Sequence, residues 1–219
     1  MALAVADGER MWCAQEAGGA LASQRLLPLA FELLHAAEIK PAQLDAVAFG
    51  RGPGAFTGLR TACSVAQGLA LGIGCPVLSI DSLMIVAEEA RVRCGVDALW
   101  VAMDARMDEA YAGAYRFVQG RWQVERAPAL FTLAALHAAW SARPLPAVAG
   151  SALAAFGARL DAGAARRIDA AGTDRAGALA RLALAAWAQG EAIDAAQALP
   201  LYLRDKVALT SAERDAARA

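Results

Sequence analysis

The chain has 219 residues and a formal net charge of −1, with 21 Lys and Arg against 22 Asp and Glu and only two His. This balance argues against a nucleic-acid grip made by this chain alone, because phosphate contacts need clustered basic side chains. No apolar stretch reaches the roughly 18 residues of a membrane-spanning helix, and the N-terminus lacks a signal-peptide pattern, so we expect a cytoplasmic protein.

The first part of the chain alternates strand and helix patterns. It begins with a predicted strand, turn, strand and helix, at residues 1–5, 7–8, 10–15 and 23–37. A second predicted series of strand, helix, strand and helix occupies residues 45–49, 57–72, 76–80 and 83–92. The three helices begin at side chains that favour the N-cap position, namely Ser23, Thr57 and Ser82.

The second part of the chain begins with a strand meander. Three strands are predicted at 99–103, 110–117 and 122–126, with turns at 106–108 and 119–120. A helix, a strand and two more helices follow, at 132–142, 147–149, 151–160 and 174–189, and Gly190 is the expected C-cap. The pattern alone predicts only a mixed α/β protein. The broad repetition of the element order suggests two related lobes, and we place their boundary near residue 95, which gives residues 1–95 and 96–219.

A glycine-rich loop joins the strand at 45–49 to the helix at 57–72. Glycine stands at positions 50, 52 and 54, with Pro53 between the last two. Glycine permits positive φ and a close backbone approach, and a helix start directs free N–H groups outward. The loop matches neither GxxxxGK[ST] nor GxGxxG. It is either a tight connection without a ligand or a contact surface for a partner.

Two helices carry patterns that suit contact with another helix. In the second helix the small residues Gly58, Ala62, Ala66 and Ala70 recur every four positions, a spacing that lets a neighbour approach closely. That row faces either the interior of the lobe or a partner. Apolar side chains of the first helix could supply the other half of an exposed pair: Leu27, Phe31 and Leu34.

Residues that could support catalysis or bind a metal are few. The four cysteines show no CxxC pair, and His35 and His137 form no HxxxH motif, so we expect no metal and no other cofactor. An acidic cluster of Asp104, Asp108 and Glu109 surrounds a predicted turn, where Asp is favoured for backbone reasons. We therefore interpret the cluster as a turn, in which Arg106 pairs with the carboxylates, and not as an acid–base centre.

Three segments resemble one protein family. Residues 50–60, Gly-Arg-Gly-Pro-Gly-Ala-Phe-Thr-Gly-Leu-Arg, are similar to the signature of the bacterial TsaB family, also called YeaZ. Residues 103–111 look like the family's central hairpin and residues 200–208 like its closing segment, in the family's order. The resemblance implies an α/β actin-like fold (ASKHA, ribonuclease H-like) with two lobes.

The resemblance also implies a function. The family is the non-catalytic partner of a TsaD-type catalytic subunit, which it binds and stabilises. With a TsaE-type ATPase, that pair transfers threonylcarbamoyl to N6 of adenosine 37 in tRNA, which forms threonylcarbamoyladenosine (t6A). This chain would then meet tRNA only through the complex, and it could form a homodimer when alone. The alternative is a stand-alone actin-fold enzyme, either a glycoprotease-like metallopeptidase or an ATPase or kinase.

Related proteins associate through the two helices, which places the partner-binding site. Carried onto this sequence, the implied site contains residues from the first helix, the glycine-rich loop and the start of the second helix: Leu27, Phe31, Leu34, Gly54, Phe56, Thr57, Gly58, Arg60, Thr61 and Ala62.

One departure from the family concerns the N-terminus. Members begin with a strand that ends in an Asp-Thr-Ser-like turn, ahead of the strand matched by residues 2–5. We expect that strand to be missing here, through a start codon placed downstream or a chain cut short. In the family's fold it lies inside the first lobe's sheet, so its loss would expose ladder groups on both neighbours. Its turn faces the nucleotide in actin-like proteins, so no nucleotide binding is expected.

Overall fold

The protein is described by a computed structural model that covers residues 1–19, 22–169 and 174–204. Its helices are α1 (Ala22–Ala36), α2 (Phe56–Ile73), α3 (Ser82–Cys94), α4 (Leu133–Ala142), α5 (Ala152–Phe156) and α6 (Arg175–Ala188). Its strands are β1 (Ala2–Asp7), β2 (Arg10–Gln15), β3 (Val47–Gly52), β4 (Val77–Asp81), β5 (Ala98–Asp104), β6 (Glu109–Val118), β7 (Arg121–Thr132), β8 (Ala147–Ala149) and β9 (Arg166–Ile168). Short 3-10 turns cover Pro41–Gln43, Gly157–Arg159 and Ala195–Gln197.

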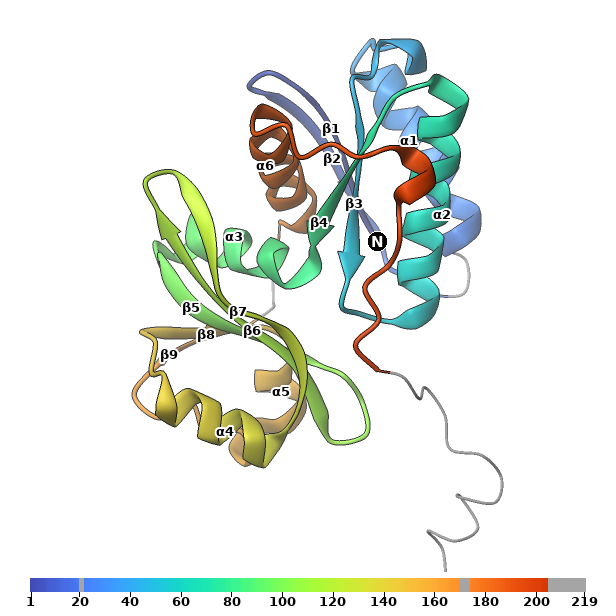
Figure 1. Cartoon of the computed structure of the whole chain (residues 1–219). Coiled ribbons are helices and arrows are strands. Elements are labelled where there is room, and N and C mark those ends of the chain that lie inside the picture. The colour runs from blue at the N-terminus through green and yellow to red at the C-terminus, as the bar shows by residue number, and fades with distance from the viewer. Residues whose placement is uncertain (20–21, 170–173, 205–219) are drawn as a thin grey trace, which may run out of the picture.

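The N-terminal elements form two separate two-stranded sheets. Strands β1 and β2 pair antiparallel, and β3 and β4 pair parallel. Helix α6 packs against all four strands, whereas α1 covers β1 and β2 and α2 covers β3 (Figure 1). The two sheets therefore share one layer, with α6 on one side and the pair α1 and α2 on the other.

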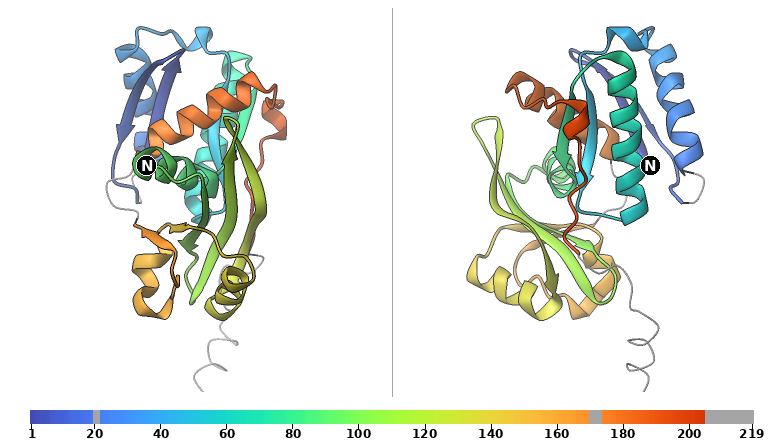
Figure 2. Two further views of the ribbon diagram at one scale, coloured as in Figure 1. Left: turned by 90° about the vertical axis from the view of Figure 1, so that its left-hand side faces the viewer. Right: turned by 45° about the vertical axis from the view of Figure 1, so that its right-hand side comes forward.

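The middle of the chain forms one five-stranded sheet in the order β7-β6-β5-β8-β9. Helices α4 and α5 cover one face of it and α3 covers the other, as Figure 2 shows from two further directions. Neighbouring residues of β5 serve opposite faces, because side chains alternate along a strand. Trp100 packs in the cluster with Leu136 of α4, and Leu99 packs in the cluster with Leu83 of α3.

The chain returns to the N-terminal elements after the five-stranded sheet. Helix α6 packs against the cluster that contains Leu78, Ile80 and Ile85, and Ile193 forms a bridge with Val77. Residues 175–198 therefore lie with the elements of the first part of the chain. A division into two lobes near residue 95 stays a proposal. In such a division, α6 and Ile193 pack with the N-terminal lobe although they follow residue 95 in the sequence.

Apart from β9 and details at their ends, the predicted elements agree with the structure. The strand predicted over 45–49 runs instead from Val47 to Gly52, so the first two glycines of the predicted loop belong to β3. The strands over 1–5, 10–15 and 99–126 are confirmed, although β7 continues to Thr132. Strand β9 was not predicted, since its sequence Arg-Arg-Ile lacks an apolar pattern. The helix predicted over 151–160 is shorter, and Gly157 follows it at a φ of +53°.

The predicted N-caps are wrong in three places, and the C-cap of α6 is Gln189 where Gly190 was expected. Helix α2 begins at Phe56 with Ala55 as N-cap, so Thr57 lies inside the first turn. Helix α3 begins at Ser82, and Asp81 caps it by accepting a hydrogen bond from the Leu83 amide at 2.8 Å. Helix α1 begins at Ala22, so Ser23 is not its cap. For α3, the sequence alone does not show which of the adjacent residues Asp81 and Ser82 is the N-cap, because both side chains favour that position.

Candidate functional site

The glycine-rich loop divides into an inner and an outer half. A Cβ atom on Gly52, whose φ is +119°, would lie 2.7 Å from the carbonyl oxygen of Leu201. A Cβ on Gly50 would lie 3.1 Å from the Ser82 hydroxyl, which accepts a hydrogen bond from the Gly52 amide at 2.9 Å. Gly58, by contrast, faces open space. The first glycines therefore serve packing within the protein, and the later part of the motif faces outward.

A stack of three side chains fixes the start of α2. The Arg60 guanidinium lies 3.9 Å from the centre of the Phe56 ring. Its Nε donates a hydrogen bond to the Tyr202 hydroxyl at 3.2 Å, and the Phe56 and Tyr202 rings lie 5.1 Å apart. Tyr202 belongs to the predicted closing segment, of which residues 205–208 lie outside the described residues. The described part of that segment therefore holds the N-terminal end of α2 in place.

Most of the predicted partner-binding residues are accessible at the surface. Leu27 is 40% exposed and Phe31 is 45% exposed. Thr57, Gly58 and Arg60 are also exposed, and the half-buried members are Gly54, Phe56, Thr61 and Ala62. Leu34 is different, because it is 6% exposed and packs in the core with Val5. The apolar pattern of α1 did not show that Leu34 lies on the buried face and Leu27 on the exposed face, because both faces of the helix carry leucine.

The row of small residues in α2 does not form one surface. Ala66 and Ala70 are 4% and 0% exposed and pack in the core beside Phe49. Residues four apart turn by about 40° around a helix, so such a row winds from the surface into the core. Helices α1 and α2 are neighbours, and their exposed or half-buried residues Leu27, Phe31, Thr57, Gly58, Thr61 and Gly68 are called here the α1–α2 surface.

Each carboxylate of the predicted acidic cluster has an arginine partner. The pairs are Asp104 with Arg106 at 3.1 Å, Asp108 with Arg159 at 2.9 Å and Glu109 with Arg204 at 2.7 Å. The ion pair with Arg159 holds the pKa of Asp108 below its usual value. Within residues 1–19, 22–169 and 174–204, no group of three or more His, Cys, Asp and Glu side chains is placed to hold a metal ion. No helix among the same residues is both long enough and apolar enough to span a bilayer.

A buried polar pair, which no sequence pattern indicated, joins the N-terminal layer to the five-stranded sheet. The Tyr115 hydroxyl of β6 donates a hydrogen bond of 2.7 Å to Asp81 at the end of β4. Burial raises the pKa of the Asp81 carboxyl, although this bond and the amide of Leu83 act in the opposite direction. Burial, with Asp81 beside it, also raises the pKa of Tyr115. Both groups are already used in packing and capping, so the pair holds β4 against β6.

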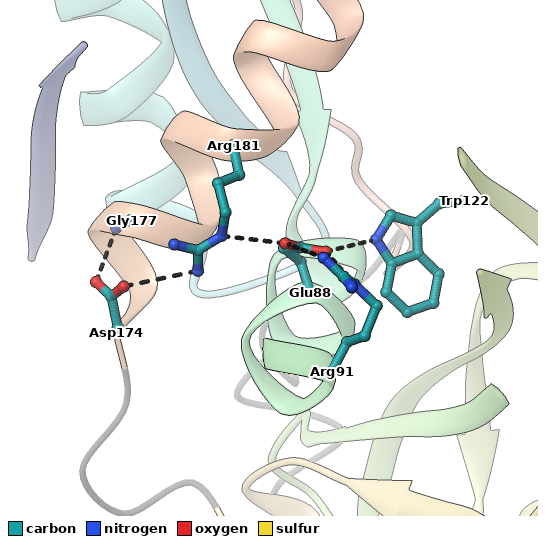
Figure 3. A network of polar contacts seen from close by, with 6 residues as sticks. All are labelled: Glu88, Arg91, Trp122, Asp174, Gly177 and Arg181. Atoms are coloured by element: carbon teal, nitrogen blue, oxygen red, sulfur yellow. Dashed lines mark hydrogen bonds and ion pairs between the residues drawn. The ribbon is translucent and has the colours of Figure 1, made fainter. Parts of the chain in front are cut away.

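A second buried network centres on Glu88 of α3, which is 3% exposed (Figure 3). Its carboxylate accepts hydrogen bonds from Arg91 at 3.0 Å, Arg181 at 3.0 Å and Trp122 at 2.9 Å. Burial raises the pKa of Glu88, but these donors outweigh burial and hold it below the usual value. The donors come from α3, α6 and β7, so one carboxylate ties the returning helix to the five-stranded sheet.

The N-terminal layer contains a cavity of about 630 Å³. All of β1 and the first half of β3 line it, together with apolar side chains of α1, α2 and α6. Phe31 and Ala62, two of the predicted partner-binding residues, also line it.

Comparisons with known proteins agree on one family. A sequence profile of the TsaD family, described as tRNA N6-adenosine threonylcarbamoyltransferase, matches residues 21–210. A crystal structure of a Pseudomonas aeruginosa protein described as similar to the peptidase YEAZ superposes with a TM-score of 0.85 at 38% identity, over 93% of this chain and 94% of that one. YeaZ from Pseudomonas aeruginosa superposes with a TM-score of 0.82 at 37% identity, over 92% and 93%. The actin-like α/β fold that the resemblance implied is thereby confirmed.

The curated relatives match over a shorter stretch. The chain is 37% identical to the tRNA threonylcarbamoyladenosine biosynthesis protein TsaB of Escherichia coli over 116 residues, which is 52% of this chain and 50% of that protein. It is 43% identical to TsaB of Haemophilus influenzae over 89 residues, which is 41% of this chain and 38% of that protein. These matches span half or less of the relatives' length.

Proposed function

We propose that this chain, which belongs to the TsaB (YeaZ) family, is the non-catalytic subunit that binds and stabilises a TsaD-type catalytic subunit in t6A synthesis. The observation that carries the proposal is the α1–α2 surface beside the family's signature loop. There Leu27 and Phe31 are 40% and 45% exposed, and Gly58 faces open space.

The shape of this surface suits a helical partner. Two exposed apolar side chains can enter a partner's grooves, and glycines at positions 58 and 68 let a second helix backbone come close. The Arg60, Phe56 and Tyr202 stack fixes the start of α2, so the surface loses little freedom when a partner binds. The face formed by α1 and α2 would therefore make a four-helix contact with an equivalent pair of helices in the partner subunit.

The division of labour follows from the residues present. The reaction transfers the threonylcarbamoyl group from its adenylate to N6 of adenosine 37, with AMP as the leaving group, and in this proposal the TsaD-type subunit performs it, together with a TsaE-type ATPase. The chain has a formal net charge of −1, so tRNA would be held mainly by the other subunits. We place the complex in the cytoplasm, and we expect a homodimer through the same surface when the partner is absent.

Co-purification with the TsaD-type subunit and sizing of the product test the proposal. The informative variant is Gly58→Arg, because the position lies in open space and an added side chain meets nothing in the isolated chain. Ala138→Arg is the matched control, since Ala138 is an exposed small residue within α4. We expect the unchanged chain and the Ala138→Arg variant to form a heterodimer, and Gly58→Arg to weaken it by about 100-fold, as for a residue at the centre of an interface.

Three outcomes would count against the proposal. Equal binding by Gly58→Arg would remove the α1–α2 surface as the contact. A reconstituted modification reaction that runs at full rate without this chain would remove the subunit role itself. Tight binding of ATP and Mg²⁺ by the isolated chain, measured by calorimetry, would instead favour the stand-alone ATPase or kinase.

A further inference from the structure

We propose that residues 198–204 couple the start of α2 to the tip of the β5–β6 hairpin, and that Arg204 is the side chain that holds the tip in its conformation. The hairpin tip is residues 105–109, and residues 198–204 are called here the linking segment. The proposal goes beyond the proposed function, because it concerns the isolated chain and holds whether or not a partner is bound.

The hairpin tip has an unusual backbone. Three consecutive residues that are not glycine, Arg106, Met107 and Asp108, have φ of +64°, +54° and +57°. This region is unfavourable for an L-residue, because its Cβ approaches the following carbonyl oxygen. The Ala105 amide donates a hydrogen bond to the Glu109 carbonyl at 2.9 Å, which closes the turn. Conformations of this kind persist where surrounding contacts determine them, so the tip needs support from outside the turn.

Arg204 supplies this support from a distant part of the chain. Its Nη2 donates hydrogen bonds to the Ala105 carbonyl at 3.0 Å and to the Arg106 carbonyl at 3.3 Å. The same nitrogen is ion-paired with Glu109 at 2.7 Å, and the Arg204 side chain is only 11% exposed. A guanidinium presents its donors in a rigid planar fork, so one side chain fixes two carbonyls and a carboxylate relative to one another.

The other side-chain contacts of the tip are local or exposed. Asp104 accepts a hydrogen bond from the Arg106 amide at 2.8 Å, two residues away. Arg159 is ion-paired with Asp108, but the two side chains are 60% and 68% exposed, and exposed pairs contribute little. Arg159 therefore offers a matched control for Arg204, since both arginines contact the same five residues.

The other end of the linking segment is fixed against β3 and α2. The Leu201 amide donates a hydrogen bond of 2.7 Å to the Arg51 carbonyl, and a Cβ on Gly52 would lie 2.7 Å from the Leu201 carbonyl oxygen. Tyr202 stacks at the start of α2, as described above, and one residue separates it from Arg204. Because so short a stretch of chain has its two ends fixed, a displacement at one end is carried to the other.

The coupling connects two exposed sites. Arg60 and Tyr202 are exposed at the α2 end, and Met107, at 55% exposure, projects from the hairpin tip. A contact that orders one end favours the ordered state of the other, and such a coupling is reciprocal. The linking segment would therefore let binding at the start of α2 order the hairpin tip of the five-stranded sheet.

Amide hydrogen exchange on the 219-residue chain tests the proposal. Arg204→Gln removes the guanidinium at the hairpin end, and Tyr202→Ala removes the stacked ring at the α2 end. Arg159→Gln is the matched control, with the same change of side chain at the exposed contact. The Glu109 amide, which donates to the Arg106 carbonyl at 3.1 Å, reports on the tip, and the Leu59 amide, which donates to the Ala55 carbonyl at 2.9 Å, reports on the start of α2.

Both ends should respond to a change at either one. We expect Arg204→Gln to speed exchange by about 10-fold at Glu109 and about threefold at Leu59, and Tyr202→Ala to show the reverse order. Arg159→Gln should leave both rates within about twofold of the unchanged chain. The amide of Val101, at 0% exposure in β5, should keep its rate in every variant, which shows that the fold is intact.

Three outcomes would overturn the proposal. They are an unchanged rate at Glu109 in Arg204→Gln, an equal increase in Arg159→Gln, and changes confined to the nearer end in both Arg204→Gln and Tyr202→Ala. If Arg204→Gln also speeds exchange at Val101, Glu109→Gln takes its place, because it removes the ion pair and leaves the two carbonyl contacts.

Glu109→Gln should still speed exchange at Leu59, and an unchanged rate there would overturn the coupling. These rates are measured without any partner, so a failure to bind the TsaD-type subunit would leave them unaffected. The two proposals therefore fail separately.

Discussion

The two sheet regions of this protein differ in how completely their strands are paired. In the five-stranded sheet, β5 has neighbours on both edges and helices over both faces, and its first five residues are all buried (Figure 1). In the N-terminal layer the strands are divided between two pairs, with a cavity of about 630 Å³ between them. Both regions are built from strands and helices, so they differ in how the strands are hydrogen-bonded to one another and not in the kinds of secondary structure that they contain.

In this protein the tightly packed core lies at the continuous sheet, and the cavity lies where two strand pairs are not hydrogen-bonded to each other. Where strands are continuous, side chains on both faces pack to the density of a crystal. Where no strand lies between β1 and β3, side chains of the flanking helices face the cavity and have fewer atoms to pack against. The α1–α2 surface belongs to the second region, and Phe31 and Ala62 also line the cavity.

The largest expected effect comes from shortening one leucine in each region. Leu136, at 0% exposure, packs under the five-stranded sheet, whereas Leu33 is 9% exposed and lines the cavity. We expect Leu136→Ala to lower the free energy of unfolding by about 4 kcal/mol and Leu33→Ala by about 2 kcal/mol, since the second side chain already faces open space. Urea unfolding of both variants measures the difference. Equal losses would contradict the contrast between the two regions.

A somewhat smaller effect is expected where the two regions join. Glu88→Gln removes the charge that Arg91 and Arg181 share, and we expect it to cost about 2 kcal/mol at pH 7. Because the folded-state pKa of Glu88 is lowered, its contribution is present above the usual value of 4.5 and is lost as pH falls through the folded pKa. The difference in the free energy of unfolding between Glu88→Gln and the unchanged chain should therefore become smaller toward pH 3. A pH-independent difference would mean that packing, and not charge, stabilises the network.

Asp81 should show the opposite dependence on pH, with a smaller effect. Its folded-state pKa is raised above the usual 3.8, so the folded protein binds a proton more tightly than the unfolded chain. The free energy of unfolding then falls as pH rises from about 4 through the folded pKa. Asp81→Asn removes this dependence, so its stability relative to the unchanged chain should increase with pH. Thermal unfolding from pH 4 to pH 8 measures this, and a decreasing difference would contradict the burial of an ionisable pair.

The smallest effect is expected at the exposed hairpin of the five-stranded sheet. Asp108 is ion-paired with Arg159 at the surface, where such pairs contribute little. We expect Asp108→Asn to leave both the unfolding temperature and the rate of a reconstituted modification reaction unchanged within error. A large loss of rate with an unchanged fold would instead revive an acid–base role for the acidic cluster.

Much of this architecture could be predicted from the sequence. The period-two patterns located strands β5, β6 and β7, and the glycine-rich loop marked the connection from β3 to α2. The predicted partner-binding residues are accessible only in part. Leu27 is exposed as expected, but Leu34 is buried, because a leucine-rich helix does not reveal which of its stripes meets the sheet.

Sequence alone determined the local features, because turn chemistry and apolar periodicity act over a few residues. Glycine at position 52 is one case, since its φ of +119° suits no other residue. Only the tertiary structure decided which groups meet across long separations. Tyr115 reaches Asp81, Arg181 reaches Glu88, and β1 lies across a cavity from β3. These contacts depend on how layers pack, which is set by the summed burial of many residues and leaves no mark at any one position.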